Sequence, residues 1–271
     1  MTAIQTKDIT LDIGHFHLKD ISCSIPAGKI TAIVGPNGSG KSTILKLITQ
    51  LTKQTSGQVY IHNKQANQYS LKKLSQTISM LPQSKEGLPD LTVKELVAYG
   101  RSPYKKLFEH RLTKEDEKII DWALNLTDTK KYEHRLLHTL SGGERQRARI
   151  AMALAQSTDI LILDEPTTFL DIAHQLDLME MLQHINEHYR MTIIMVLHDL
   201  QQAAAYSHHL IAVKNGLIQA MGSPAAILNS QFLQDIYDID AKVQFDGEFP
   251  IIIPNTKKLR RNRNGYSHKY E

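Results

Sequence analysis

The 271-residue sequence is poor in cysteine and contains no long apolar run. Its single cysteine, Cys23, has no partner within the chain, so a disulfide-stabilised scaffold is excluded. No run approaches the roughly 18 apolar residues that a membrane-spanning helix needs. Apolar residues make up 41% and charged residues 22% of the chain, a globular composition that excludes disorder as the main state. At this length we expect one large domain, or a domain with a subdomain.

The chain shows no N-terminal targeting signal, and together with the lone thiol this favours the cytosol. Cys23 lies in an alternating, strand-like stretch from Ile21 to Ile25, so we expect it to be buried and structural.

Positive charge is concentrated at the C-terminus. The formal net charge is +4, but residues 255–271 contain six Lys and Arg against one Glu, a net charge of +5 that leaves −1 on residues 1–254. The basicity therefore belongs to a tail, and we do not expect nucleic acid as a partner. A flexible, solvated tail is the first interpretation, and attraction to anionic lipid is the second.

Apolar runs predict the strands. Residues 30–34, 160–163 and 192–197 are β-branched or aliphatic throughout, which is typical of parallel strands covered on both faces. A further strand is expected at 57–62, and Asn215-Gly216 between two apolar runs indicates a hairpin.

Helical spacing and capping residues predict helices over residues 42–51, 92–99, 113–126 and 173–190. In the last of these we expect an inward stripe of Leu176, Met179, Leu182, Ile185 and Tyr189. The stretch from about 84 to 158 has helix signals and no clear strand. The whole pattern therefore predicts a parallel α/β core with an inserted helical block.

A glycine-rich loop follows the first of these strands and precedes the first helix. Residues 35–42, Gly-Pro-Asn-Gly-Ser-Gly-Lys-Ser, match the phosphate-binding pattern GxxxxGK[ST]. The glycines allow backbone N–H groups to surround phosphate oxygens, Lys41 can reach the β- and γ-phosphates, and the Ser42 hydroxyl can bind Mg²⁺. The residues predicted to bind nucleotide are Gly35, Pro36, Asn37, Gly38, Ser39, Gly40, Lys41, Ser42 and Thr43.

A second motif selects among the nucleotide-binding families. Residues 140–146, Leu-Ser-Gly-Gly-Glu-Arg-Gln, resemble the LSGGQ signature of ABC-type ATPases. Ser141 and Glu144 form a capping-box pattern, and a first turn with Gly142 and Gly143 exposes N–H groups that make an anion site. We therefore identify the chain as similar to an ABC transporter ATP-binding subunit. In that family Ser141, Gly142 and Gly143 would meet the γ-phosphate of a nucleotide held by another subunit.

The resemblance assigns further catalytic roles. Asp164 ends the run at 160–163 like a Walker B aspartate, and Glu165 follows it as the general base that polarises the attacking water. Gln83 matches the Q-loop glutamine, which senses Mg²⁺ and γ-phosphate. The implied Mg²⁺ ligands are Ser42, Gln83 and Asp164.

Two more motifs follow in the family's order. Asp171 matches the D-loop, and the resemblance implies that it binds nucleotide, although Thr168-Phe169 departs from the usual Ser-Ala. His198 matches the switch histidine that contacts γ-phosphate. The implied catalytic set is Glu165, His198, Gln83 and Lys41.

The resemblance implies a P-loop NTPase fold: a mostly parallel RecA-like core, an N-terminal antiparallel β part and an inserted helical subdomain. We expect a single ABC ATPase domain over residues 1–254. Its expected parts are a core at 1–83 and 159–225, a helical subdomain at about 84–158 and a C-terminal extension at 226–254, followed by the basic tail at 255–271.

Two features fit less directly. The family stacks adenine on an aromatic residue, but Ile13 falls where tyrosine is common, leaving His15, Phe16 or His17 as substitutes. His184 and His188 match the metal-protease pattern H-x-x-E-H, yet we interpret them as surface histidines on a helix whose apolar side faces inward.

Stretches outside the ATPase motifs resemble the importer branch that handles iron-siderophores, haem and cobalamin; they are residues 91–101, 165–172, 196–203, 237–243 and 250–254. The resemblance implies an ATP hydrolase that powers ferric hydroxamate import. Haem or cobalamin import is an alternative, and a soluble ATPase of iron–sulfur cluster assembly is an alternative of a different class.

The implied cofactors are ATP and Mg²⁺. The implied partners are a second copy, in a head-to-tail dimer that completes two nucleotide sites, and integral-membrane permease subunits at the cytoplasmic face. A substrate-binding protein would be an indirect partner. A groove at the Q-loop and residues about 84–105 would receive the permease.

Overall fold

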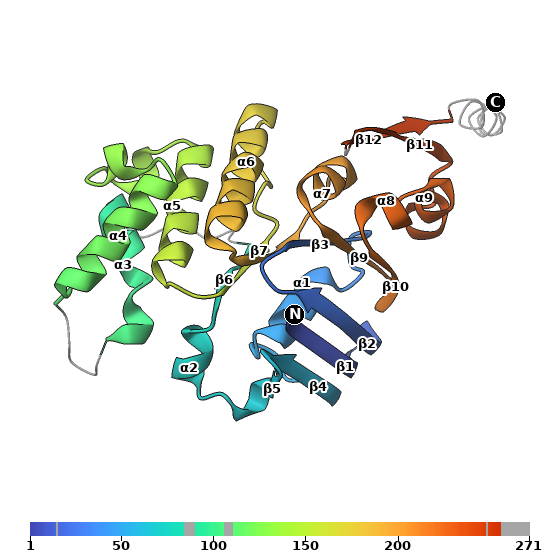
Figure 1. Cartoon of the computed structure of the whole chain (residues 1–271), viewed down its shortest axis with the longest axis horizontal. Coiled ribbons are helices and arrows are strands. Elements are labelled where there is room, and N and C mark those ends of the chain that lie inside the picture. The colour runs from blue at the N-terminus through green and yellow to red at the C-terminus, as the bar shows by residue number, and fades with distance from the viewer. Residues whose placement is uncertain (15, 84–89, 106–110, 248, 256–271) are drawn as a thin grey trace, which may run out of the picture.

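The computed structural model describes residues 1–14, 16–83, 90–105, 111–247 and 249–255. These residues form a four-stranded sheet, a six-stranded sheet and a two-stranded hairpin, with helices packed around them (Figure 1). Across the described ranges, no helix combines the length and apolar character needed to cross a bilayer.

The central sheet has the strand order β10-β9-β3-β8-β7-β6. Its neighbours pair in parallel except for the edge strand β10, which returns from β9 through the predicted turn at Asn215-Gly216. The three predicted apolar runs become β3, β8 and β7, each buried along its full length. The strands are β3 (Ile30–Val34), β6 (Ile78–Leu81), β7 (Ile160–Asp164), β8 (Thr192–Val196), β9 (His209–Lys214) and β10 (Leu217–Gly222).

An antiparallel sheet lies on one face of this core, with strand order β2-β1-β4-β5. Its apolar side chains and α1 pack with Ile33, Ile162 and Ile194 of the central sheet. Cys23 is buried in this layer, as predicted, and burial raises the pKa of its thiol. The elements are β1 (Thr2–Ile13), β2 (Phe16–Pro26), β4 (Ser56–Ile61), β5 (Lys64–Gln65) and α1 (Lys41–Ile48).

Helices cover the other face of the central sheet, where Ala32, Leu163 and Met195 join a second apolar cluster. The alternation of inward residues between these two clusters explains why the strands are continuously apolar. The remaining helices are α2 (Leu71–Ser75), α3 (Val93–Tyr99), α4 (Lys114–Leu126), α5 (Gly142–Ala155), α6 (Ile172–Tyr189), α7 (Leu200–Tyr206), α8 (Pro224–Ile227) and α9 (Ser230–Tyr237). The observed mixed α/β fold, with its parallel core and antiparallel part, confirms the predicted fold class.

The prediction for α6 was partly wrong. Met179, Leu182 and Ile185 are buried as expected, but Leu176 is 40% and Tyr189 48% exposed. The Tyr189 hydroxyl instead accepts an exposed hydrogen bond from the indole Nε1 of Trp122 on α4, 3.1 Å away. Helix α1 is also shorter than predicted, because it ends at Ile48 rather than at residue 51.

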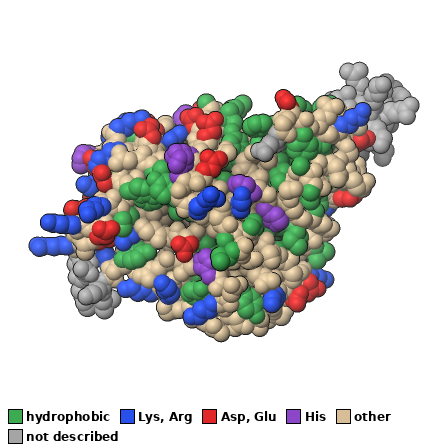
Figure 2. All heavy atoms as spheres, viewed as in Figure 1, with side chains coloured by type: hydrophobic (Ala, Val, Ile, Leu, Met, Phe, Trp, Pro, Cys, Tyr) green, Lys and Arg blue, Asp and Glu red, His purple; other side chains and the backbone are tan. Residues whose placement is uncertain are grey.

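Helices α3, α4 and α5 pack together as one block, seen at the left of Figure 1. Helices α3 and α4 each begin with a capping box, formed by Thr92 with Glu95 and by Thr113 with Asp116. On this side of the molecule basic and acidic side chains are interspersed (Figure 2).

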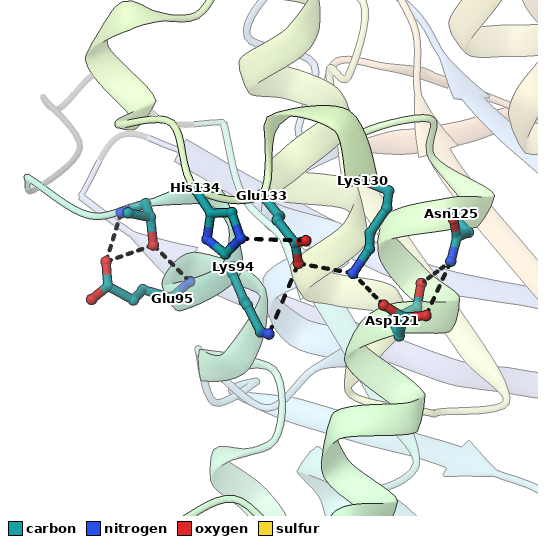
Figure 3. Close-up of polar contacts among 8 residues, drawn as sticks. Lys94, Glu95, Asp121, Asn125, Lys130, Glu133 and His134 are labelled. Atoms are coloured by element: carbon teal, nitrogen blue, oxygen red, sulfur yellow. Dashed lines mark hydrogen bonds and ion pairs between the residues drawn. The ribbon is translucent and has the colours of Figure 1, made fainter.

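Charged side chains also join the helices of this block. Lys130 Nζ lies 2.5 Å from Asp121 Oδ1 on α4 and 2.9 Å from Glu133 Oε2 (Figure 3). The same Glu133 oxygen lies 3.9 Å from Lys94 Nζ on α3. Inside the block, Arg101 Nε donates to Asp116 Oδ1 over 2.7 Å, and both side chains are buried. The block is therefore held by polar contacts as well as by its apolar core.

The C-terminal hairpin of β11 (Ala241–Asp246) and β12 (Phe249–Pro254) packs against α7. Neither it nor β6 was predicted from the sequence. The basic tail, beyond Asn255, and the segment 84–89 of the expected permease groove lie outside the described residues.

Candidate functional site: a nucleotide pocket at the carboxyl edge of the central sheet

The phosphate loop joins β3 to α1, and its lysine is folded back onto the loop. Lys41 Nζ donates to the carbonyl oxygens of Gly35 and Pro36, at 2.8 and 2.9 Å. Gly40 has a φ of 109°, and a Cβ added at Gly35 would lie 1.9 Å from the carbonyl of Val213, so both positions require glycine. Burial lowers the pKa of Lys41, against the opposing charges of Glu165 and Asp164. The loop therefore holds a desolvated cation ready for an anionic ligand.

Asp164 stands at the end of β7, beside the start of α1. Ser42 Oγ donates to its Oδ1 over 2.9 Å. Burial raises the pKa of Asp164, although the Ser42 hydrogen bond lowers it. A hydroxyl and a buried carboxylate side by side are hard oxygen donors that fit a magnesium ion.

Glu165 is the centre of a hydrogen-bonded cluster. His198 Nε2 lies 2.6 Å from its Oε1, and Gln83 Nε2 donates to its Oε2 over 2.5 Å. The Thr168 hydroxyl also donates to Oε2, at 3.1 Å. Glu165 has a φ of 54°, which is uncommon for a non-glycine residue and is found at functional sites. The structure thus brings together three residues that were singled out far apart in the sequence.

Thr168 is the member of this cluster that the sequence analysis did not assign. It was noted only as a departure from the D-loop pattern. Its amide N–H donates to the carbonyl of Glu165 in a turn, over 3.3 Å, which brings the hydroxyl back to the glutamate. Its position three residues after Glu165 was the signal in the sequence that a turn could bring its hydroxyl to the carboxylate.

A pocket of about 470 Å³ lies at this site. Its lining combines Glu165, His198 and Gln83 with residues of the phosphate loop. Of the predicted nucleotide-binding residues, those that line it are Asn37, Gly38, Gly40, Lys41, Ser42 and Thr43. Gly35 and Pro36 hold Lys41, and Ser39 is a buried residue of the loop.

An aromatic side chain lies at the rim of the pocket. Phe16, at the start of β2, lines this pocket and an adjoining one that also includes His17 and Asn215. His17 lines only the adjoining pocket and is paired with Asp12, with its Nδ1 2.5 Å from Asp12 Oδ1. Ile13 lines neither pocket, and His15 lies outside the described residues.

The signature residues form a separate surface. Ser141 caps α5, accepting from the Glu144 N–H, and both arms of the predicted capping box are present. A Cβ added at Gly143 would lie 2.2 Å from His174 Cδ2, so the glycine lets α5 approach the start of α6. Ser141, Gly142, Gly143 and Asp171 are absent from the lining of the pocket. Asp171 instead caps α6 and pairs with His174 at 2.7 Å.

The two histidines of the H-x-x-E-H pattern are exposed on α6, as predicted. Their rings lie 3.9 Å apart, and His188 Nδ1 contacts the carbonyl of His184 over 3.0 Å. In the part of the chain that the structure describes, no cluster of three or more His, Cys, Asp and Glu side chains could hold a metal ion.

A sequence model of the ABC transporter family matches residues 18–168, from β2 to the D-loop. The chain therefore belongs to the ABC transporter family.

Within the family, the chain is 47% identical over 239 residues to the petrobactin import ATP-binding protein of Bacillus anthracis, covering 88% of each protein. It is 43% identical to the iron(3+)-hydroxamate import ATP-binding protein of Bacillus subtilis, covering 91% of each. Among solved structures, it resembles a dimeric ATP-binding cassette in a post-hydrolysis state with ADP and Pi bound. That match has a TM-score of 0.69 and 30% identity, and covers 82% of this chain and 98% of the other.

Proposed function

We propose that this chain is the ATP-hydrolysing subunit of an importer for ferric siderophores, with hydroxamates as the first candidate cargo. The observation that carries the catalytic part is the contact of Glu165 with both His198 and Gln83 beside the phosphate loop. The cargo is supported by the names of the relatives, which import petrobactin and iron(3+)-hydroxamate.

Nucleotide binding is assigned to the phosphate-loop side of the pocket. Lys41 exchanges its two carbonyl partners for phosphate oxygens, which costs little because Lys41 is already desolvated. Ser42 and Asp164 would hold Mg²⁺, together with Gln83, which lines the same pocket as Ser42. The metal, when bound, would neutralise charge on the phosphate oxygens.

Hydrolysis is assigned to Glu165 and its neighbours. Glu165 accepts a proton from the attacking water at one carboxylate oxygen. His198 and Gln83 now occupy both oxygens, so at least one of them must move aside to admit the water. Each is then placed to contact the γ-phosphate. Thr168 keeps the carboxylate oriented while this exchange occurs.

Adenine is assigned to Phe16. This side chain lies at the junction of the two adjoining pockets, where a base attached to phosphates in the loop would reach it. Stacking on an aromatic ring is worth about 1–3 kcal/mol per base in other proteins. Phe16→Ala should therefore weaken ATP binding about tenfold or more, whereas Ile13→Ala should leave it unchanged.

A second copy of the chain is required to complete the site. The signature residues expose the N-terminus of α5 away from the pocket of their own chain, so their anion site is available to another copy. The related cassette that binds ADP and Pi is a dimer. We assign the same head-to-tail arrangement here, closing on MgATP and opening after hydrolysis.

The remaining partners are permease subunits at the cytoplasmic face of the membrane and, through them, a substrate-binding protein. This assignment rests on the import names of the relatives.

The test is genetic. Deleting the gene should abolish growth on ferric hydroxamates as sole iron source, and the unaltered gene should restore it, while Glu165→Gln should not. Growth on haem and the use of cobalamin are scored in parallel. Unchanged growth on ferric siderophores, with loss of either of the other two, would reassign the cargo without affecting the ATPase.

A further inference from the structure

Two glutamines connect the D-loop to the helix that follows His198. Gln175, in the first turn of α6, donates from Nε2 to the carbonyl oxygen of Leu170 over 2.8 Å. Gln202, on α7, donates from its own Nε2 to Gln175 Oε1 over 2.7 Å. Both contacts are partly buried. They connect the D-loop, through α6, to α7. Helices α6 and α7 lie side by side in Figure 1.

One end of this bridge lies directly behind His198. Asp199 caps α7 and accepts from the N–H groups of Gln201 and Gln202, at 2.8 and 3.0 Å. Gln202 therefore belongs to the first turn of the helix whose cap is the neighbour of His198. A shift of this turn would move the backbone that carries the imidazole.

The other end lies at an exposed and strained loop. Phe169 is 85% exposed, and its φ of 67° is an outlier for a bulky side chain. Thr168, just before it, bonds Glu165, and the backbone oxygen of Phe169 lies 4.0 Å from the Cβ position of Gly142 in the signature. A second copy approaching the signature of this chain would therefore meet the D-loop as well.

Gln202 is kept in place at an energetic cost. Its Oε1 is buried and has no hydrogen-bond partner among the described residues. A buried unpaired oxygen is unfavourable, and an apolar side chain of similar size would avoid it. What Gln202 has and an apolar side chain would lack is the hydrogen bond from its Nε2 to Gln175.

We propose that Gln175 and Gln202 are positioning residues that keep the D-loop in register with His198. Contact of a second copy with the D-loop then sets the orientation of the imidazole toward Glu165. This proposal rests on the proposed function, since it requires both the two-copy site and a role for His198 in hydrolysis.

The test uses Gln175→Ala, Gln202→Ala and the double variant of the full chain, with kcat and KM measured for MgATP hydrolysis. Each single change should lower kcat about fivefold, because Gln202→Ala removes the contact between the two glutamines, and Gln175→Ala removes that contact together with the one to Leu170. KM should stay within about twofold, because neither glutamine lines the pocket. The double variant should be no slower than either single one, because the two contacts act as one unit.

Two further variants separate the arms and control for folding. Gln175→Glu keeps an acceptor for Gln202 but loses the donor to Leu170, so it should be as slow as Gln175→Ala. Gln202→Met keeps the length of the side chain without its donor, and replaces the alanine variant if that chain unfolds. Gln201→Ala, at an exposed position on the same helix, is the matched control and should behave as the wild type.

Unchanged kcat in the glutamine variants, or a double variant about 25-fold slower through independent effects, would overturn the proposal. A raised KM with normal kcat would also overturn it. Failure of the proposed function looks different: the wild type itself would not hydrolyse ATP, or Glu165→Gln would hydrolyse it normally.

Discussion

The phosphate-loop side and the signature side of this protein differ in how complete they are within one chain. On the first side, Lys41 is held by the loop that follows β3, and Ser42, next to it at the start of α1, contacts Asp164 at the end of β7. On the signature side, Ser141 and Gly142 are exposed at a helix N-terminus and do not line the pocket of their own chain.

The difference indicates where assembly can exert control. The phosphate-loop side is preorganised by the sheet, so it can bind nucleotide in a single copy. In the proposed two-copy arrangement, the signature side gains a ligand only when another copy presents one. Hydrolysis would then depend on encounter between copies, whereas binding would not, and variants of the two sides should separate these steps.

The largest effect is expected for Glu165→Gln. The amide cannot accept the proton from water, so kcat should fall about 100-fold or more, while ATP binding is retained. With MgATP the variant should accumulate as a dimer, measured by light scattering after size exclusion. If the MgATP-bound variant stays monomeric, the two-copy arrangement is wrong.

Lys41→Ala should act on binding instead. It removes the cation that faces the phosphate oxygens, and we expect ATP affinity to fall at least about tenfold in isothermal titration. Lys46→Ala, on the same helix, is the matched control because its side chain lies outside the pocket lining. Unchanged affinity of Lys41→Ala would remove the role assigned to this lysine.

A mixture of two inactive variants tests the shared site most directly. Ser141→Ala keeps a working phosphate loop, and Lys41→Ala keeps a working signature. In a head-to-tail dimer of the two, one of the two sites is intact, so the mixture should hydrolyse ATP faster than either variant alone. Ser141→Thr retains an N-cap hydroxyl and controls for the roughly 1 kcal/mol cost of losing the cap. Activity no greater than that of the separate variants would contradict a site built from two copies.

The same contrast explains what could be predicted from the sequence. The phosphate-loop side follows local rules: an apolar run, a glycine-rich loop and an amphipathic helix were each recognisable, and the structure has all three. The contact of Glu165 with Gln83 depends on tertiary packing, so only the family resemblance assigned both residues to one site. The contact of Glu165 with Thr168 is made within a local turn, and it was missed. Phe16 was one of three candidates because a β-turn does not specify which neighbouring side chain faces the pocket.

Helix α6 shows the limit of periodicity. Its spacing predicted Tyr189 to face inward, but this residue is the last of the helix and is 48% exposed. There it meets Trp122 of the helical block at the surface. Periodicity gives the face of a helix, but not how far along the helix its neighbour extends.

The smallest effect on catalysis, and the clearest on stability, is expected from Asp116→Asn in the block that carries the signature helix. Asp116 is buried against Arg101, which also donates to the carbonyl of Ala155 at the end of α5, 2.9 Å away. Removing the charge leaves Arg101 buried without its counter-ion, and should lower the free energy of unfolding by about 3 kcal/mol.

The pH dependence of this difference has a fixed sign. Burial raises the pKa of Asp116, but hydrogen bonds from Arg101 and Thr113 outweigh it and leave the pKa below its usual 3.8. The stabilisation is therefore present above about pH 4 and lost as the pH falls through the lower pKa of the folded state. Thermal unfolding of wild type and variant should converge at acid pH and differ most near neutrality. Asp121→Asn, in the exposed network on the same helix, should cost less than about 1 kcal/mol, since exposed pairs contribute little. If both variants lost the same stability, burial of the Arg101–Asp116 pair would not be what holds the signature side in place.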